Sequence, residues 1–230
     1  MSKNYQGILG PQIGKIGPVV GYRWKGRDVY RGHVKYKKNP RTPSQELVRA
    51  KFRLISNIAR AFSPALNFGY AYLANSLQVS PRNVFTKNNM DNITGATPAA
   101  LQVNFSELTL ADGPITPAFD GNLRFADGTL TMQVGDAGQY GCFDDEYDRV
   151  VMVVYNKDKG VTKTAEATRE RAAESGVSMS IPDAWNDDKA EVYLFVRTTV
   201  TEPTVYAEYS GTVYPGMASA SFYVNEITLS

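Results

Sequence analysis

The 230-residue sequence has one cysteine, Cys142, and one histidine, His33. A single cysteine excludes a disulfide within the chain and any zinc or iron–sulfur site that needs several cysteine ligands, and we interpret Cys142 as a small core residue. With one histidine, any Ser-His-Asp or Cys-His mechanism would have to use His33, which lies in a strongly basic segment. No convergent set of acid, base and nucleophile can be assembled, so we expect no enzyme activity.

Long apolar runs are also absent. No stretch approaches the ~20 apolar residues that a membrane-crossing helix requires. The first residues, MSKNYQGILGPQIGKIG, interrupt every apolar pair with glycine or proline and do not resemble a secretory signal. They also fail as a phosphate-binding loop, because Leu9 and Ile16 occupy positions that need Gly and Ser or Thr. We therefore expect a protein made in the cytoplasm, with no membrane contact and no cofactor.

Charge is distributed unevenly along the chain. Residues 1–60 contain fourteen Lys and Arg against Asp28 and Glu46, a net charge of +12. Residues 61–230 contain eleven Lys and Arg against twenty-one acids, a net charge of −10. Such asymmetry is informative about partners and assembly rather than about fold.

The most basic segment begins with an extended glycine-rich arm, expected over residues 1–18, and continues as a β-hairpin from residue 19. In VVGYRWKGRDVYRGHVKYK (19–37) aromatic and basic residues alternate around Gly26. A three-residue Lys25-Gly26-Arg27 loop would collect the aromatic residues on one face and the cations on the other, whereas a two-residue Gly26-Arg27 turn would mix them. We favour the three-residue loop, with the aromatic face packed on the helices as core.

Two helices are expected next. Thr42, Pro43 and Gln45 form a strong start signal for a helix over about 43–62, on which Arg49, Arg53 and Arg60 share one stripe opposite an apolar face. Ser63 and Pro64 predict a second helix to about residue 78, with Gly69 as its weak point. The hairpin and helices form a module over 19–80, followed by a polar linker over 81–100.

Short alternating segments dominate residues 101–230 and predict an all-β, immunoglobulin-like sandwich. We expect strands at 101–110, 122–126, 129–134, 149–155, 177–181, 190–200, 204–214 and 219–229, while 163–176 has a helix-forming composition and stays ambiguous. The fold class is therefore α+β. Acidic clusters at 143–148 and 186–191 could hold calcium or act as acid and base, but they lack the calcium-loop spacing and are interpreted as solvated turns. Trp185 is interpreted as a core aromatic residue, with carbohydrate binding as the alternative.

Two blocks of residues resemble a family of proteins of unknown function from Bacteroidota and the phages that infect them. The first comprises GKIG (14–17), VVG (19–21), WKG (24–26), Arg31 and NPRTP (39–43) with Gln45, Arg49 and Phe52; the second comprises IP (181–182), AW (184–185) and EVYLF (191–195). The resemblance implies a basic hairpin and helix followed by an immunoglobulin-like domain, and it carries no known reaction. The long C-terminal segment after residue 211 departs from the pattern.

We expect a non-enzymatic structural or assembly protein, a phage virion component that attaches through its basic N-terminal segment to copies of itself or to other virion proteins, forming an oligomer. Nucleic-acid binding without sequence preference is the alternative, and a glycan- or protein-binding surface module is a weaker one. The expected partner-binding cations are Arg23, Lys25, Arg27, Arg31, Lys35, Lys37, Lys38, Arg41, Arg49, Arg53 and Arg60. The arm residues are Gly7, Gly10, Gly14, Lys15 and Gly17.

Overall fold

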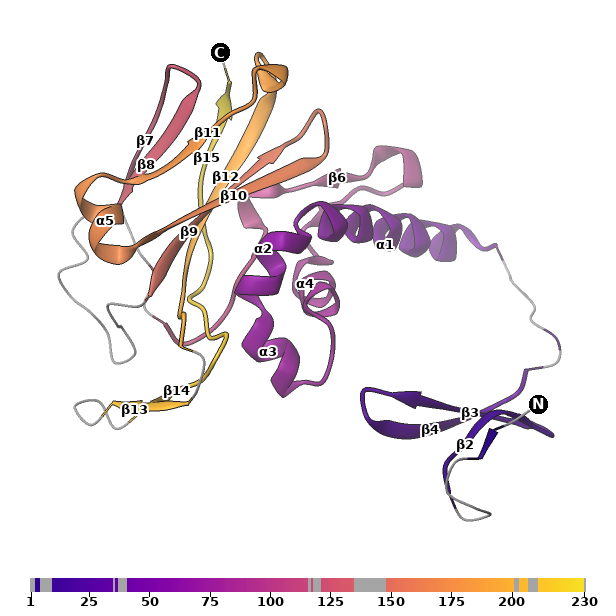
Figure 1. Ribbon diagram of the computed structural model, residues 1–230. Coiled ribbons are helices and arrows are strands. Elements are labelled where there is room, and N and C mark those ends of the chain that lie inside the picture. The colour runs from indigo at the N-terminus through magenta and orange to yellow at the C-terminus, as the bar shows by residue number, and fades with distance from the viewer. Residues whose placement is uncertain are drawn as a thin grey trace. The chain divides into compact units, whose positions relative to one another are not determined.

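The computed structural model describes residues 3–4, 10–34, 36, 41–115, 117, 121–134, 148–200, 203–206 and 211–229. The chain forms two compact units, Met1–Gln45 and Glu46–Ser230, which are described separately. Unit 1 is a small sheet, and unit 2 combines helices with a larger antiparallel β structure (Figure 1). The predicted α+β fold class is confirmed.

Unit 1 is an antiparallel four-stranded sheet with strands in chain order. Its strands are β1 (Lys3–Asn4), β2 (Gln12–Ile16), β3 (Val19–Trp24) and β4 (Arg27–Gly32). Residues 12–16, which we expected within an extended arm, are therefore a paired strand. Gly21 is required at the centre of the sheet, because a Cβ atom there would lie 1.9 Å from the carbonyl oxygen of Gln12.

The β3–β4 hairpin has a register that the sequence analysis did not anticipate. Trp24 lies opposite Arg27, which leaves Lys25 and Gly26 as a two-residue turn. Both turn residues have positive φ, 45° and 80°, as a type I′ turn requires. The favoured three-residue loop is therefore wrong, and so is the Gly26-Arg27 turn. The argument for segregated faces failed because it assumed that one face of this sheet is buried, whereas Gly21 alone is buried among its described residues.

Four helices follow the N-terminal sheet, and the first of them leads into unit 2. The predicted first helix is confirmed, and the main-chain N–H of Gln45 donates to the Thr42 hydroxyl at 3.4 Å. The predicted second helix is instead two short helices separated at Tyr70, and its N-cap is Phe62 rather than Ser63. A fourth helix occupies the expected linker, capped by the Ser80 side chain. The helices are α1 (Pro43–Ala61), α2 (Ser63–Gly69), α3 (Ala71–Ser76) and α4 (Pro81–Asn89).

The β part of unit 2 is a two-sheet sandwich with an immunoglobulin-like topology. Its seven main strands are β7 (Gly121–Ala126), β8 (Thr129–Val134), β9 (Arg149–Asn156), β10 (Val161–Thr168), β11 (Val177–Ser180), β12 (Lys189–Arg197) and β15 (Phe222–Thr228). The first, second and fifth form one sheet in the order β11-β8-β7, and the others form the sheet β10-β9-β12-β15. The fourth strand thus joins the third, whereas in constant-type immunoglobulin domains it joins the first-strand sheet.

Smaller elements decorate this sandwich. Helix α5 (Arg169–Glu174) joins β10 to β11 within the ambiguous 163–176 stretch. The expected strand at 101–110 is reduced to β6, and the expected strand at 204–214 is a hairpin inserted between β12 and β15. These elements are β5 (Ile93–Thr94), β6 (Gln102–Val103), β13 (Thr204–Tyr206), β14 (Gly211–Val213) and the 3₁₀ turns Pro98–Ala100, Phe105–Glu107 and Asp183–Trp185.

Strands β9 and β12 are buried on both faces. One face of β9, including Met152 and Val154, packs in the core between the two sheets. The other face, including Val153 and Tyr155, packs on the helices in a second core. Figure 1 shows α2, α3 and α4 on one side of the β9–β12 sheet and β7, β8 and β11 on the other. The helices are therefore a third layer of unit 2 and share its core, rather than forming a module with the N-terminal hairpin.

Candidate functional site

The register of the N-terminal sheet places aromatic and cationic side chains on the same face. Residues that lie directly opposite each other on neighbouring strands point to the same side of a sheet. Tyr22 lies opposite Val29, and Trp24 lies opposite Arg27. We call this side the mixed face. Its members are Lys15, Val20, Tyr22, Trp24, Arg27, Val29 and Arg31.

The aromatic residues of the mixed face are exposed within this structure. Trp24 is 55% exposed and Tyr22 is 40% exposed. The Arg31 guanidinium carbon lies 5.9 Å from the centre of the Tyr22 ring, a cation–π contact that holds one cation beside one aromatic plane. Among the described residues of unit 1, only Gly21 is buried. The sheet therefore has no hydrophobic core of its own there, and three-stranded or larger sheets generally need one, or a packing partner, for stability.

The opposite face of the sheet is different in character. The Arg23 Nε lies 4.0 Å from the Asp28 carboxylate, its direct cross-strand neighbour. Tyr30 extends across Gly21, and its hydroxyl accepts a hydrogen bond from the Gln12 main-chain N–H at 3.1 Å. Asp28 is the one acid among residues 1–45, which contain ten Lys and Arg, so unit 1 has a net charge of +9.

The structure brings together only part of the predicted cation set. Arg27 and Arg31 share the mixed face with Lys15, Arg23 lies on the opposite face, and Lys25 lies in the hairpin turn. Arg41 precedes α1, on which Arg49, Arg53 and Arg60 are exposed as the helical spacing predicted. Gly10 lies at a bend before β2, Gly14 lies within β2, and Gly17 lies in the β2–β3 turn. Lys35, Lys37, Lys38 and Gly7 lie outside the described residues.

Sequence reasoning missed the grouping of cations and aromatics because it chose the wrong register. The missing signal was the Lys-Gly pair itself: glycine at the second turn position suits a type I′ turn, although lysine is an unusual first residue.

Sequence reasoning also missed a pair of exposed apolar side chains on helix α1, where Val48 and Phe52 are 62% and 56% exposed. Both residues lie one turn apart at the flank of the predicted apolar face, and sequence alone does not reveal which part of such a face is covered.

Several residues of the acidic clusters are engaged in ion pairs and hydrogen bonds within the described part of the chain. The Glu191 carboxylate lies 2.9 Å from Lys157 Nζ and accepts a hydrogen bond from the Tyr223 hydroxyl at 2.8 Å. Burial, together with this negatively charged acceptor, raises the pKa of Tyr223 above its ordinary value. Asp148 is buried 3.5 Å from Arg169. Residues 135–147 lie outside the described residues, and among the described residues no group of three potential metal ligands occurs.

Asp188 forms an ion pair that should make the stability of the folded chain depend on pH. Hydrogen bonds from Lys159 and Asn156 lower the pKa of this carboxyl below its ordinary value. The folded state then favours the charged form, so the contribution is present above the unfolded pKa of about 4 and is lost as pH falls through the lowered folded value. We expect urea unfolding between about pH 5 and 2 to show a steeper loss of stability in the natural chain than in Asp188→Asn. Parallel pH profiles would contradict this assignment.

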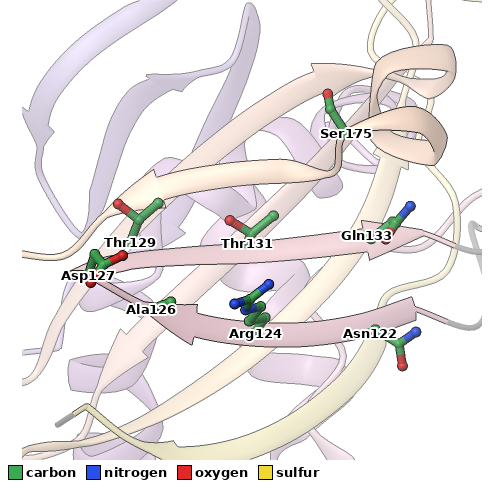
Figure 2. Close-up of a pocket in the computed structure, with 8 residues that line it drawn as sticks. All are labelled: Asn122, Arg124, Ala126, Asp127, Thr129, Thr131, Gln133 and Ser175. Atoms are coloured by element: carbon green, nitrogen blue, oxygen red, sulfur yellow. The ribbon is translucent and has the colours of Figure 1, made fainter.

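A shallow hollow on the outer surface of β7 and β8 is the other candidate site (Figure 2). Its lining is mainly polar and includes Arg124, Asp127 and Gln133. Small-molecule sites are usually lined mostly by apolar and aromatic groups, and this hollow has none larger than Ala126. Trp185, the other candidate ligand platform, is 5% exposed and belongs to the sandwich core, so the carbohydrate-binding alternative for it is wrong. The mixed face of unit 1 is therefore the stronger candidate.

Comparison with known proteins finds a family whose model spans parts of both units. No helix in the described ranges is long and apolar enough to cross a bilayer. No curated protein and no solved structure matches the chain. Residues 11–209 do match a family model, and that match begins just before β2, includes the whole mixed face and ends between β13 and β14. The chain thus belongs to a family of unknown function (DUF6266).

Proposed function

We propose that this chain is a non-enzymatic assembly protein that attaches to an anionic partner through its N-terminal unit. One observation carries the proposal: a sheet with a net charge of +9 exposes its aromatic residues and has no core of its own among the described residues. Exposed aromatic side chains and a missing core lower the stability of an isolated sheet. Such a surface is typical of an element that becomes stable when a partner covers it.

Unit 2 has the properties of a rigid body that presents this element. Its central strands are buried on both faces, and its two cores include side chains from every layer. Interiors of this kind are close-packed and resist deformation. Glu191, Asp188 and Asp148 of the acidic clusters are engaged in ion pairs, which supports a structural role over a catalytic one.

Copies of the chain are the simplest partners. Residues 46–230 contain fifteen Lys and Arg and twenty-two acids, a net charge of −7 against +9 for residues 1–45. Attachment of unit 1 of one copy to unit 2 of the next is a heterologous contact, which builds rings or filaments. A phage virion is the setting that the sequence resemblance implies, and neighbouring virion proteins with acidic surfaces would serve the same unit.

Sedimentation velocity at low and high salt tests this proposal. At roughly 50 mM NaCl we expect the full chain to form species larger than a monomer, and at roughly 500 mM, where exposed charges are screened, to dissociate. A chain of residues 42–230, which keeps the Thr42 cap, should stay monomeric at both concentrations.

Two charge-reversal variants distinguish association through the mixed face from a general effect of net charge. Arg27→Glu with Arg31→Glu should abolish association at low salt. Lys87→Glu with Arg171→Glu changes the net charge equally, but on exposed positions of unit 2, and should preserve it. A full chain that is monomeric at both salt concentrations would contradict attachment between copies.

A further inference from the structure

The mixed face combines two features that rarely share an exposed sheet surface. Tyr22 and Trp24 are two residues apart on one strand, so their side chains point the same way about 6.6 Å apart along it. Arg27 and Arg31 are four residues apart on β4, so their side chains also point to one face of the sheet. Arg27 lies directly opposite Trp24. Aromatic rings from β3 and guanidinium groups from β4 therefore lie on one surface instead of on opposite surfaces.

We propose that the mixed face binds single-stranded nucleic acid, with Tyr22 and Trp24 stacking on bases and Lys15, Arg27 and Arg31 contacting phosphates. This inference rests on the proposed role of unit 1 as an attachment element and names one partner for one of its faces. Proteins that bind single strands without sequence preference pair a cationic surface with aromatic platforms on which successive bases stack. The separation of the two rings along β3 is about twice the 3.4 Å rise of stacked bases, so it suits an extended strand.

The geometry favours single strands over duplexes. Stacking requires an accessible base plane, and bases in a duplex already stack on each other. On a duplex, the two exposed rings of this sheet face would meet the backbone or base edges rather than base planes. Phosphate contact by cations alone would not require Trp24 and Tyr22 to be exposed beside them.

The two faces of the sheet differ in whether their cations are paired with a carboxylate of unit 1. On the opposite face Arg23 is paired with Asp28, and the Tyr30 hydroxyl is engaged by the main chain of Gln12. On the mixed face the cations have no carboxylate of unit 1 to pair with, because Asp28 is the one acid of residues 1–45 and lies on the other side. The mixed face is therefore the side that presents both uncompensated charge and free base-stacking area.

The inference is tested on the full chain with an oligothymidylate of about 16 nucleotides, a duplex of the same length, and heparin as a polyanion without bases. Trp24 is exposed and Trp185, the other tryptophan, is buried, so intrinsic fluorescence reports stacking at Trp24. We expect the oligothymidylate to quench this fluorescence and to bind more tightly than the duplex. Three phosphate contacts predict a slope of about −2 in a plot of log affinity against log salt.

Trp24→Leu separates stacking from charge, because it keeps an apolar side chain and every cation. It should weaken oligothymidylate binding roughly 5- to 150-fold, the range measured for loss of one base–aromatic stack. Heparin binding should not change, and this also verifies that the sheet remains intact. Tyr36→Ala, an exposed tyrosine beyond β4, is the matched control and should leave both affinities unchanged.

Oligothymidylate binding that matches duplex binding, or that Trp24→Leu leaves unchanged, would overturn the inference and leave a purely electrostatic surface. No oligothymidylate binding, together with salt-sensitive self-association, would overturn it too and assign the mixed face to a protein partner, while the proposed assembly function would stand. Absence of both oligothymidylate binding and self-association would reject the inference and attachment between copies together.

Discussion

Replacing Phe62 with alanine is expected to lower the free energy of unfolding of unit 2 by about 3–5 kcal/mol, the range for deleting a buried phenylalanine ring. Phe62 is fully buried where α1 ends and α2 begins. Its ring centre lies 4.8 Å from that of Tyr155 on β9 and 5.7 Å from that of Tyr193 on β12. The side chain therefore joins the helical layer to the central sheet, and its loss leaves a cavity in the core that they share.

Urea unfolding followed by circular dichroism measures this effect, and Phe52→Ala is the matched control. Phe52 lies on the same helix but is 56% exposed, so its removal should change stability by less than about 1 kcal/mol. A single transition in both variants is expected, because helices and sandwich share one core. If Phe62→Ala cost less than about 1 kcal/mol, or if helices and strands unfolded in separate transitions, the three-layer description of unit 2 would be wrong.

Replacing Glu191 with alanine is expected to cost about 2–3 kcal/mol. The carboxylate is almost fully buried on β12, between Lys157 Nζ and the Tyr223 hydroxyl. Removing one member of a buried ion pair typically costs about 3–5 kcal/mol, because the remaining charge loses its partner. The cost should be somewhat lower here, because Lys157 is partly exposed and also lies 3.3 Å from Glu226.

Glu226→Ala is the control for this prediction. It removes a carboxylate from the same lysine, but Glu226 is on the exposed edge of the network, where ion pairs contribute about 0–1 kcal/mol. Chemical denaturation of both variants at neutral pH measures the difference. Equal effects of the two substitutions would show that burial of Glu191 has no energetic consequence and that this network does not stabilise the sheet.

Much of unit 2 follows from local sequence signals. The Thr42-Pro43 start signal and the apolar face of α1 gave its bounds within a residue, and strands β7, β8, β9, β11 and β12 lie close to the predicted segments. Each of these segments has its own turn residues at both ends. The bounds of a helix or strand can be predicted from sequence where the residues that begin and end it are its immediate neighbours.

Two features of unit 2 that the sequence left open depend on tertiary contacts. Residues 163–168 have a helix-forming composition, yet they lie in β10, whose eight residues pair with β9 along its full length. The apolar run Val150–Tyr155 indicates a strand buried on both faces, but the sequence does not state what covers the second face. The answer, helices α2–α4, depends on contacts between residues far apart in the chain.

The candidate site was predicted in composition but not in arrangement. Its cations and aromatics were identified from the sequence, whereas a change of one residue in hairpin register decided which of them share a face. A two-residue Lys25-Gly26 turn reversed the conclusion that the aromatics are core residues. The nucleic-acid alternative, which needs both kinds of residue on one side, gained its main support from this register.

Hydrogen exchange measured by mass spectrometry tests the central idea most directly, namely that unit 1 is completed by a partner. In a dilute monomer at high salt, amides of β2–β4 should exchange fast while those of β9 and β12 are protected, because only the latter lie in a core. Association at low salt, or addition of an anionic ligand, should slow exchange in β2–β4. Protection of β2–β4 equal to that of β9 in the isolated monomer would contradict the account.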